Sequence, residues 1–500
     1  LYGDVVNLTH PLGMVDDNLM KRYSDNVKIF ANAYVSVELM KGLKYKLNLT
    51  PDFQFYRYNS YEGLFDFGLA KHDITAVTEQ QTRTRNILVE NLLTFDRTFG
   101  DHKVSALVGY TYQDSRYRYM QGSGQGMPTG ITEIDAASQG LAVSGNSSRS
   151  VLTSILGRAF YSYKNRYLLT ATIRRDGSSK FGSNYRYGNF PSVSVGWNIA
   201  EEDFVKNSVS WLDQLKLRGG YGVLGNQEID NYQYVSVVTT GINYPDGKSG
   251  LIQGAFPKTF ANPDIKWEET AMTNVGIDFM ALRNRLTLTA DWYVKNTKDI
   301  LLNVPIPIST GGANDPIRNA GKIRNQGFEF NLGWNESLNK DLSYGVSFLG
   351  TYNKNEVVEM GAESQVITGG TIHGGTYTSR TLAGYPIGGF WLIPTDGYFN
   401  STEEVQAHQK DGVLIQPSAE PGDIRFKDTN NDGTINDEDR VYCGSPFPKF
   451  TYSINGNITY KNVDFSIGFQ GVTGNKIYNA TKLELTDVTR GTNYLASTLD

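Results

Sequence analysis

Large apolar side chains alternate with small or polar ones along many short stretches of this 500-residue chain. In FPSVSVGWNI, residues 190–199, every second position after the proline is apolar: Val193, Val195, Trp197 and Ile199. The positions between them hold Ser192, Ser194, Gly196 and Asn198. Strict alternation is typical of a β-strand whose two faces meet different surroundings. The stretch therefore predicts a strand with one apolar face and one hydrophilic face.

The same alternation recurs in pairs of stretches, which predicts antiparallel hairpins. We place these hairpins at residues 28–58, 84–112, 154–175, 190–223, 271–295, 327–352 and 449–471. They supply about fourteen strands, each close to the roughly ten residues with which a tilted strand crosses a membrane.

Short and long connections alternate along the chain. Most predicted hairpins have short turns: Met40-Lys41-Gly42, Gly100-Asp101, Lys164-Asn165, Arg283-Asn284, Asn339-Lys340 and Lys461-Asn462. The connections between hairpins are long, for example 113–153, 224–270 and 353–448. Because alternate connections of an antiparallel sheet lie at opposite ends, one end carries short turns and the other carries large loops. Outer-membrane barrels have short periplasmic turns and long extracellular loops.

Two architectures fit the alternation itself. In a soluble sandwich or propeller the apolar rows pack on another sheet. In a membrane barrel they contact lipid, the polar rows face water, and closure leaves no strand edge unpaired in hydrocarbon. Aromatic residues near strand ends fit the interfacial girdles of a barrel: Tyr110, Tyr112, Tyr163, Tyr167, Trp292 and Trp334. The unequal connections favour an all-β fold, a transmembrane antiparallel β-barrel with long extracellular loops.

Composition supports a β-rich protein and excludes several classes. The chain has 31 Tyr, 24 Phe and 52 Gly, and strands favour aromatic residues. Mean hydropathy is −0.39, and no apolar run approaches the roughly 18 residues of a membrane helix. A net charge of −5 argues against nucleic acid as a partner. The single cysteine, Cys443, excludes an internal disulfide and a multi-cysteine zinc site.

Neither the nucleophiles nor the histidines of the chain form a recognisable catalytic set. None of the 5 histidines has another histidine at metal-ligand spacing, and no Gly-x-Ser-x-Gly motif occurs. We therefore expect that the protein is not an enzyme.

One segment, DTNNDGTINDED at residues 428–439, matches the D-x-[DN]-x-[DN]-G calcium loop. The candidate metal ligands are Asp428, Asn430, Asp432, Thr434, Asn436 and Asp439. Thr434 would contribute its main-chain carbonyl, and Asp439 stands where a longer Glu is usual, which weakens the last ligand. The alternative is a hydrophilic turn rich in Asx residues that binds no ion. The sequence thus predicts Ca²⁺, or Mg²⁺, in an extracellular loop.

Many ordered segments resemble the SusC/RagA family of TonB-dependent outer-membrane transporters. They are RYLLTATIRRDGSSKFG (166–182), NFPSVSVGWNIAEEDF (189–204), LKLRGGYGVLGNQEIDNYQY (215–234), WEETAMTNVGIDF (267–279), ADWYVKNTKDILL (290–302), NAGKIRNQGFEFNLGW (319–334), GYPIGGFW (384–391), GDIRFKDTNNDGTINDEDR (422–440) and PFPKFTYSINGNITYKNVDFSIGFQG (446–471). The resemblance implies a plugged barrel of roughly 22 strands. It assigns residues 1–500 to the middle and later part of that barrel and expects the N-terminal plug outside this sequence.

The resemblance also implies a function and partners. Members import oligosaccharides or peptides across the outer membrane of Gram-negative bacteria, driven by the TonB complex, which acts through the plug. They pair with a SusD-like surface lipoprotein. The resemblance does not decide whether two such pairs form a dimer. For this chain we expect import of a bulky nutrient, with oligosaccharide first and oligopeptide second. The alternatives are a passive porin and a surface-adhesion barrel.

Overall fold

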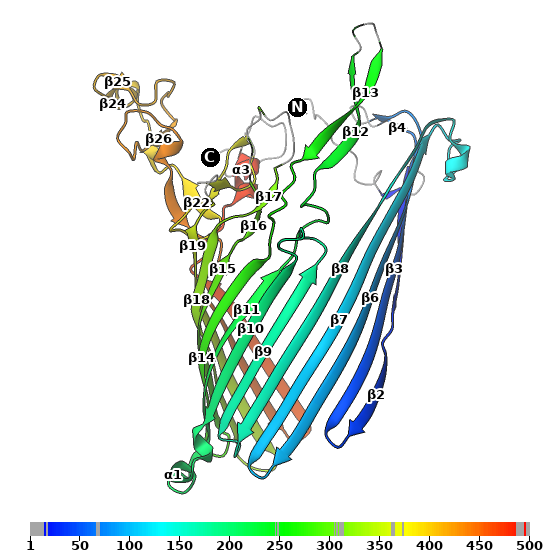
Figure 1. The fold of residues 1–500 in the computed structure, drawn as a ribbon. Helices are drawn as coiled ribbons and strands as arrows, with labels where there is room; N and C mark the ends of the chain where they lie inside the picture. The colour runs from blue at the N-terminus through cyan, green and yellow to red at the C-terminus, as the bar shows by residue number, and fades with distance from the viewer. Residues whose placement is uncertain are drawn as a thin grey trace.

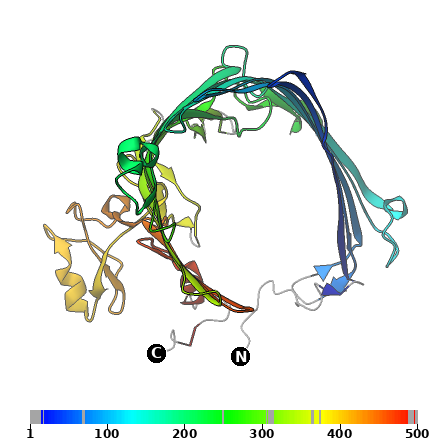
Figure 2. The same ribbon diagram turned by 90° about the horizontal axis from the view of Figure 1, so that it is seen from below.

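The computed structural model describes residues 15–16, 19–66, 71–245, 247, 250–304, 306, 309, 315–361, 366–372, 375–486 and 495–496. Its main element is a 15-stranded antiparallel sheet that curves into an open arc (Figures 1 and 2). Around the arc the strands are β1 (Met20–Phe30) with β2 (Ala33–Met40), β3 (Leu43–Glu62), β6 (Ala76–Phe99), β7 (His102–Gln125), β8 (Gln139–Tyr163), β9 (Tyr167–Ser178), β10 (Tyr187–Asn198), β11 (Leu212–Asn226), β14 (Glu268–Ala281), β15 (Leu286–Lys298), β18 (Lys322–Ser337), β19 (Leu342–Glu359), β28 (Phe450–Tyr460) and β29 (Val463–Thr473).

The remaining elements lie in the connections. They are β4 (Phe65–Asp66), β5 (Lys71–His72), β12 (Val237–Pro245), β13 (Leu251–Thr259), β16 (Leu301–Asn303), β17 (Ile317–Asn319), β20 (Ile367–Thr368), β21 (Ser379–Thr381), β22 (Gly389–Leu392), β23 (Thr395–Tyr398), β24 (Gln409–Lys410), β25 (Val413–Leu414), β26 (Ile424–Phe426), β27 (Val441–Gly444), the helices α1 (Asp203–Lys206), α2 (Thr402–Ala407) and α3 (Ala480–Thr486), and the 3₁₀ helices η2 (Ile134–Ala136), η3 (Ile199–Glu201) and η6 (Asp437–Asp439). Across the described ranges, no helix combines the length and the apolar character needed to cross a membrane.

All seven predicted hairpins are confirmed, and each is joined to the next by a further antiparallel ladder. The predicted strand length of about ten residues is wrong for several strands: β3 has 20 residues, β6 and β7 have 24 each, and β8 has 25. β6 and β7 continue past the apolar alternation into segments with polar or charged residues at most positions, QQTRTRN and DSRYRYM. Alternation between apolar and polar residues marks only the part of a strand that lies between two different media.

The connections segregate as the sequence predicts. The short turns and α1 lie at one end of the arc, and the long connections, including the β12–β13 hairpin and strands β20–β27, lie at the other (Figure 1). The turn between β8 and β9 is tight because Lys164 and Asn165 both adopt φ of 53°. Paired positive φ values match the twist of the flanking strands.

The apolar side chains of neighbouring strands form continuous rows on one face of the sheet. Val193 of β10 lies opposite Ala171 of β9 and Tyr221 of β11. Directly opposed residues of an antiparallel pair lie on the same face, so the row continues from strand to strand. Its large side chains are exposed, among them Val35, Leu47, Val108, Ile155, Leu169, Val195, Leu217, Val275, Leu332, Val346, Ile454, Ile467 and Phe469.

This exposed row decides between the two architectures. No second sheet among the described residues packs over it, and buried apolar clusters occur only near Phe181 and near Tyr61. Exposed apolar surface of this extent marks contact with lipid or a partner. The rows continue from strand to strand around the arc and are bordered by aromatic residues, as on the lipid-facing surface of an outer-membrane barrel.

Aromatic side chains border the apolar rows at both ends, as predicted. At the short-turn end Tyr163, Tyr167 and Trp197 follow one another on β8, β9 and β10. Glu202, in the link after β10, accepts hydrogen bonds from the Tyr167 hydroxyl at 2.7 Å and from Trp197 Nε1 at 3.0 Å. These two donors lower the pKa of the Glu202 carboxyl. At the other end, Trp292 of β15 lies opposite Phe328 of β18.

The exposed apolar row is called the outer row from here on. A charged residue placed in it tests its contact with lipid. We expect Val193→Arg to destabilise the full-length protein when it is folded into lipid vesicles, which lowers its free energy of unfolding. The cost is about 2–4 kcal/mol if position 193 lies near the middle of the bilayer. Ser192→Arg, one residue away on the opposite face, is the matched control and should change stability little. Equal losses for both variants in urea unfolding would contradict the assignment of the two faces.

Candidate functional site

The opposite face of the sheet is hydrophilic and forms the inner wall. It presents Ser192, Ser194, Thr170, Lys216, Asn274, Thr289, Asn331, Asn455 and Ser466, all of which occupy the positions between outer-row residues. Because the outer row faces lipid, this face borders the water-accessible interior of the barrel. It is the first candidate site, since any solute that crosses the barrel passes along it.

A network of charges holds three strands of the inner wall together. Arg218 of β11 donates from both Nη atoms to the two oxygens of Asp291 at 2.6 Å each. Its Nε donates to Asp278 of β14 at 3.1 Å. Gly276 of β14 lies between Arg218 and Asp291 in the register of the sheet, and a Cβ there would lie 2.4 Å from Asp291 Oδ1. Glycine at this position therefore permits the bidentate contact, a strong and directional form of ion pair.

Next to this network the wall is hollowed. A cavity of about 300 Å³ is bordered by Thr170, Ser194, Lys216, Arg218 and Asn274, among others. Hydroxyl, amide and cationic groups can each exchange hydrogen bonds with a hydrophilic solute. The wall thus offers polar contacts to cargo.

The predicted cation loop is the second candidate site and lies between β26 and β27, at the long-loop end. Asp428 accepts hydrogen bonds from the backbone amides of Asp432 at 3.0 Å and Gly433 at 2.7 Å. Gly433 has φ of 94°, which makes the sharp turn that was predicted at this position. The carboxylate of Asp428 therefore closes the first half of the loop.

Hydrogen bonds from Asn430 and Thr434 lower the pKa of Asp432 to about 2. Asp439 is fully buried and accepts from the backbone amides of Thr429 at 2.7 Å and Asn436 at 2.8 Å. The loop carboxylates thus bond to the main chain around them, as buried or half-buried acceptors generally must.

All six predicted ligands lie within this one loop, and its carboxylates face loop amides. Among the described residues, no group of three or more His, Cys, Asp or Glu side chains is placed to hold a metal ion. Oxygen donors are nevertheless the chemistry that Ca²⁺ prefers. The calcium site stays a prediction.

Sequence reasoning missed the residues that anchor this loop. Arg440 donates from Nη1 to the carbonyls of Tyr377 at 3.0 Å and Trp391 at 3.1 Å. Asp437 pairs with Arg440 and with Arg380, each at 2.7 Å. The only sequence signal was an arginine directly after the acidic run. These contacts attach the loop to the sheet formed by β20, β21, β22 and β27.

Residues 13–497 match the protein family described as TonB-dependent receptor-like β-barrel. The chain belongs to this family. TonB-dependent receptor P3 of Formosa agariphila is 30% identical over 96% of this chain and 47% of its own length. TonB-dependent receptor SusC of Bacteroides thetaiotaomicron is 33% identical over 66% of this chain and 32% of its own length. The chain therefore spans about half or less of the curated relatives that it matches.

Solved structures show the same fold. The structure of the RagAB peptide transporter superposes with a TM-score of 0.79 at 21% identity, over 93% of this chain and 49% of that one. The RagAB peptide importer in its "open-open" state gives the same TM-score over 94% of this chain. The resemblance to the SusC/RagA family is thus confirmed, and the family is one of outer-membrane barrels. Its curated relatives are named receptors, which agrees with the expectation that this chain is not an enzyme.

Cation binding by the loop of this TonB-dependent receptor can be measured directly. We expect Ca²⁺ to bind the full-length protein and to slow proteolysis at residues 428–439, because the ion would join oxygens from distant loop positions. The double variant Asp428→Asn, Asp432→Asn should lose both effects, whereas Asp423→Asn, outside the loop, should keep them. Calorimetric heats that do not differ between the two variants would establish a metal-free turn.

The same loop has a defined pH dependence. The pKa of Asp432 is depressed from 3.8 to about 2, so its stabilisation is present above pH 3.8 and is lost as the pH falls toward 2. Proteolysis of the loop by an acid-active protease should therefore accelerate between pH 4 and pH 2. Asp432→Asn should flatten that profile.

Proposed function

We propose that the full-length protein imports a bulky hydrophilic nutrient across the outer membrane, with energy from TonB. The observation that carries the proposal is the match of residues 13–497 to TonB-dependent receptor barrels. The hydrophilic inner wall supports it, because a polar solute loses fewer hydrogen bonds beside such a wall than beside an apolar one. In this proposal TonB acts through a plug domain.

Oligosaccharide is the first proposed cargo and oligopeptide the second. The inner wall offers hydroxyl and amide groups together with charges that are largely paired, as in the Arg218–Asp291 contact. Such a wall suits a neutral or zwitterionic polar chain. The structural neighbour RagAB is a peptide transporter, which supports oligopeptide as the second cargo.

We propose further that the long-loop end meets a SusD-like surface lipoprotein. The connection between β19 and β28 provides a folded projection there (Figure 1). Arg440 and Asp437 join the 428–439 loop to its small sheet, so the projection offers a defined surface. Ordered loops lose less conformational entropy on binding than free ones.

Adjacent glycines on β11 provide a matched test of transport through the lumen. A Cβ at Gly220 would lie 3.7 Å from Val193 O on the inner face, and one at Gly219 would lie 3.8 Å from Val195 Cγ2 on the outer face. Both positions therefore accept a side chain at ordinary van der Waals distance. We expect Gly220→Trp to reduce uptake of labelled oligosaccharide severalfold, because the ring projects into the cargo path. Gly219→Trp should leave uptake unchanged.

The same assay separates active import from the alternatives. Uptake by the parent strain should collapse when an uncoupler removes the proton-motive force. Uptake that persists with the uncoupler would identify a passive porin and overturn the proposal. Uptake of oligopeptide in place of oligosaccharide would reverse the order of the two cargoes.

A further inference from the structure

Strands β6, β7 and β8 extend beyond the lipid-facing row, and the chemistry of their outer face changes abruptly there. On β7 the outer row runs from Val104 to Tyr112 and continues with Asp114, Arg116 and Arg118. The apolar section from the short turn to Tyr112 covers about ten residues, which matches an apolar band of about 25 Å for a tilted strand. The arginines therefore begin at the boundary between hydrocarbon and the outer headgroup layer.

The register aligns these arginines with others on the neighbouring strands. Arg116 lies directly opposite Arg85 of β6 and Arg149 of β8, and Arg118 lies directly opposite Arg83. All of them share the outer face with Tyr112. Like charges directly opposite each other destabilise an antiparallel pair. Three such pairings within two rows would be disfavoured without a compensating anion.

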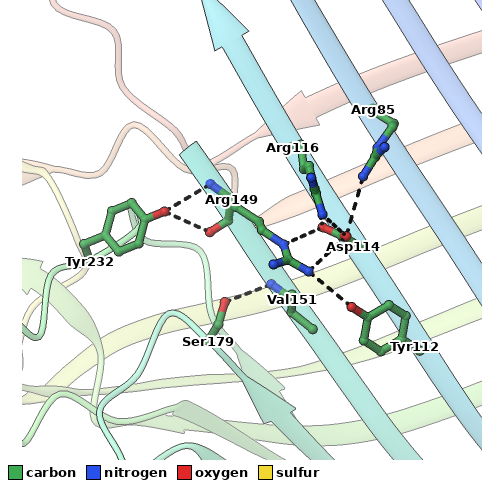
Figure 3. Close-up of polar contacts among 8 residues, drawn as sticks. All are labelled: Arg85, Tyr112, Asp114, Arg116, Arg149, Val151, Ser179 and Tyr232. Carbon is green, nitrogen blue, oxygen red and sulfur yellow. Dashed lines mark hydrogen bonds and ion pairs between the residues drawn. The ribbon is translucent and has the colours of Figure 1, made fainter. Parts of the chain in front are cut away.

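A single carboxylate offsets part of this repulsion (Figure 3). Asp114 is buried and accepts from Arg149 Nε at 3.0 Å and Arg116 Nη2 at 3.2 Å. Arg85 Nη2 lies 3.7 Å from the same carboxylate. With five guanidinium groups (Arg83, Arg85, Arg116, Arg118 and Arg149) and one carboxylate, the cluster carries an excess of positive charge.

Several donors of the cluster lack an acceptor. Arg85 Nε is buried and finds no hydrogen-bond partner among the described residues. Arg118 is exposed and makes no hydrogen bond or ion pair within the part of the chain that the structure describes. Around them lies a cavity of about 410 Å³ bordered by Arg83, Arg85, Arg116, Arg118, Arg149 and Tyr232. The cavity is large enough for a substituted phosphate and presents unused donors to it.

We propose that this cluster binds the phosphate group of a glycolipid headgroup in the outer leaflet of the membrane. Guanidinium groups bind phosphate through paired, charge-assisted hydrogen bonds. The apolar row directly below, including Val108 and Ile155, would receive the acyl chains of the same lipid. The site lies on the face opposite the lumen, so cargo on the transport path does not reach it. This binding site is independent of which nutrient is carried.

Native mass spectrometry of the full-length protein in detergent tests the proposal. The probes are bis-phosphorylated lipid A, the same lipid without phosphates, and inorganic phosphate. The double variant Arg116→Gln, Arg118→Gln should bind lipid A about tenfold more weakly, as the loss of charge-assisted hydrogen bonds implies. Arg324→Gln is the matched control: this outer-face arginine of β18 lies opposite Asn296 and Glu356, not another arginine.

The outcomes separate the possible sources of the anion. The proposal requires that the lipid without phosphates binds weakly and that inorganic phosphate at the same concentration does not displace lipid A. Equal retention of lipid A by the double variant and the parent would overturn the proposal, and so would displacement by inorganic phosphate. Equal weakening in Arg324→Gln would show nonspecific charge attraction and would also overturn it.

Folding of the variants is checked independently. The double variant removes like-charge contacts together with the ion pair between Arg116 and Asp114, so its thermal midpoint in lipid-free detergent should stay close to that of the parent. If the double variant does not fold, the single variant Arg118→Gln replaces it, since Arg118 takes part in no contact of the described network. A folded Arg118→Gln protein with unchanged lipid A binding would count against the site.

Discussion

Backbone hydrogen bonding inside hydrocarbon is the constraint on which the rest of this structure depends. Lipid offers no partner to a peptide group, so each strand must bond to a neighbour along its membrane-spanning length. β6 and β7 satisfy this requirement over their full 24 residues without a register shift. Since the backbone is fixed in this way, only the side chains remain to adapt the sheet to its surroundings. Along each membrane-spanning strand, successive side chains point in turn to the lipid and to the water-accessible interior.

The two faces handle charge differently. On the inner face, opposite charges meet across strands, as Arg218 does with Asp278 and Asp291. On the outer face, like charges are aligned beyond the apolar band, where Arg116 lies between Arg85 and Arg149. Paired charges keep a water-filled interior close to neutral for polar solutes. Aligned charges create a local positive potential that selects for anions.

The hairpins could be predicted from the sequence because apolar alternation is strong wherever a strand lies between lipid and water. The upper parts of β6 and β7, with QQTRTRN and DSRYRYM, lack that contrast, so the strands were predicted too short. The acidic loop was found by spacing alone, but its anchor at Arg440 depends on distant carbonyls. The arginine cluster required the register, because a slip of one residue transfers a side chain to the other face. The contacts of Arg218 join residues 60 and 73 positions apart, so they too could not be predicted without the strand register.

The carboxylate of Glu202 has a consequence for how the barrel sits in its bilayer. The buried carboxylate accepts hydrogen bonds from the Tyr167 hydroxyl and from Trp197 Nε1, and Arg166 contacts it at 3.3 Å. The two rings therefore cannot tilt independently to follow a thinner or thicker membrane. A mismatch in thickness must then be absorbed by the lipids near β9 and β10, at a fraction of a kcal/mol per ångström. The connection between β10 and β11 thereby fixes the position of the barrel wall along the membrane normal.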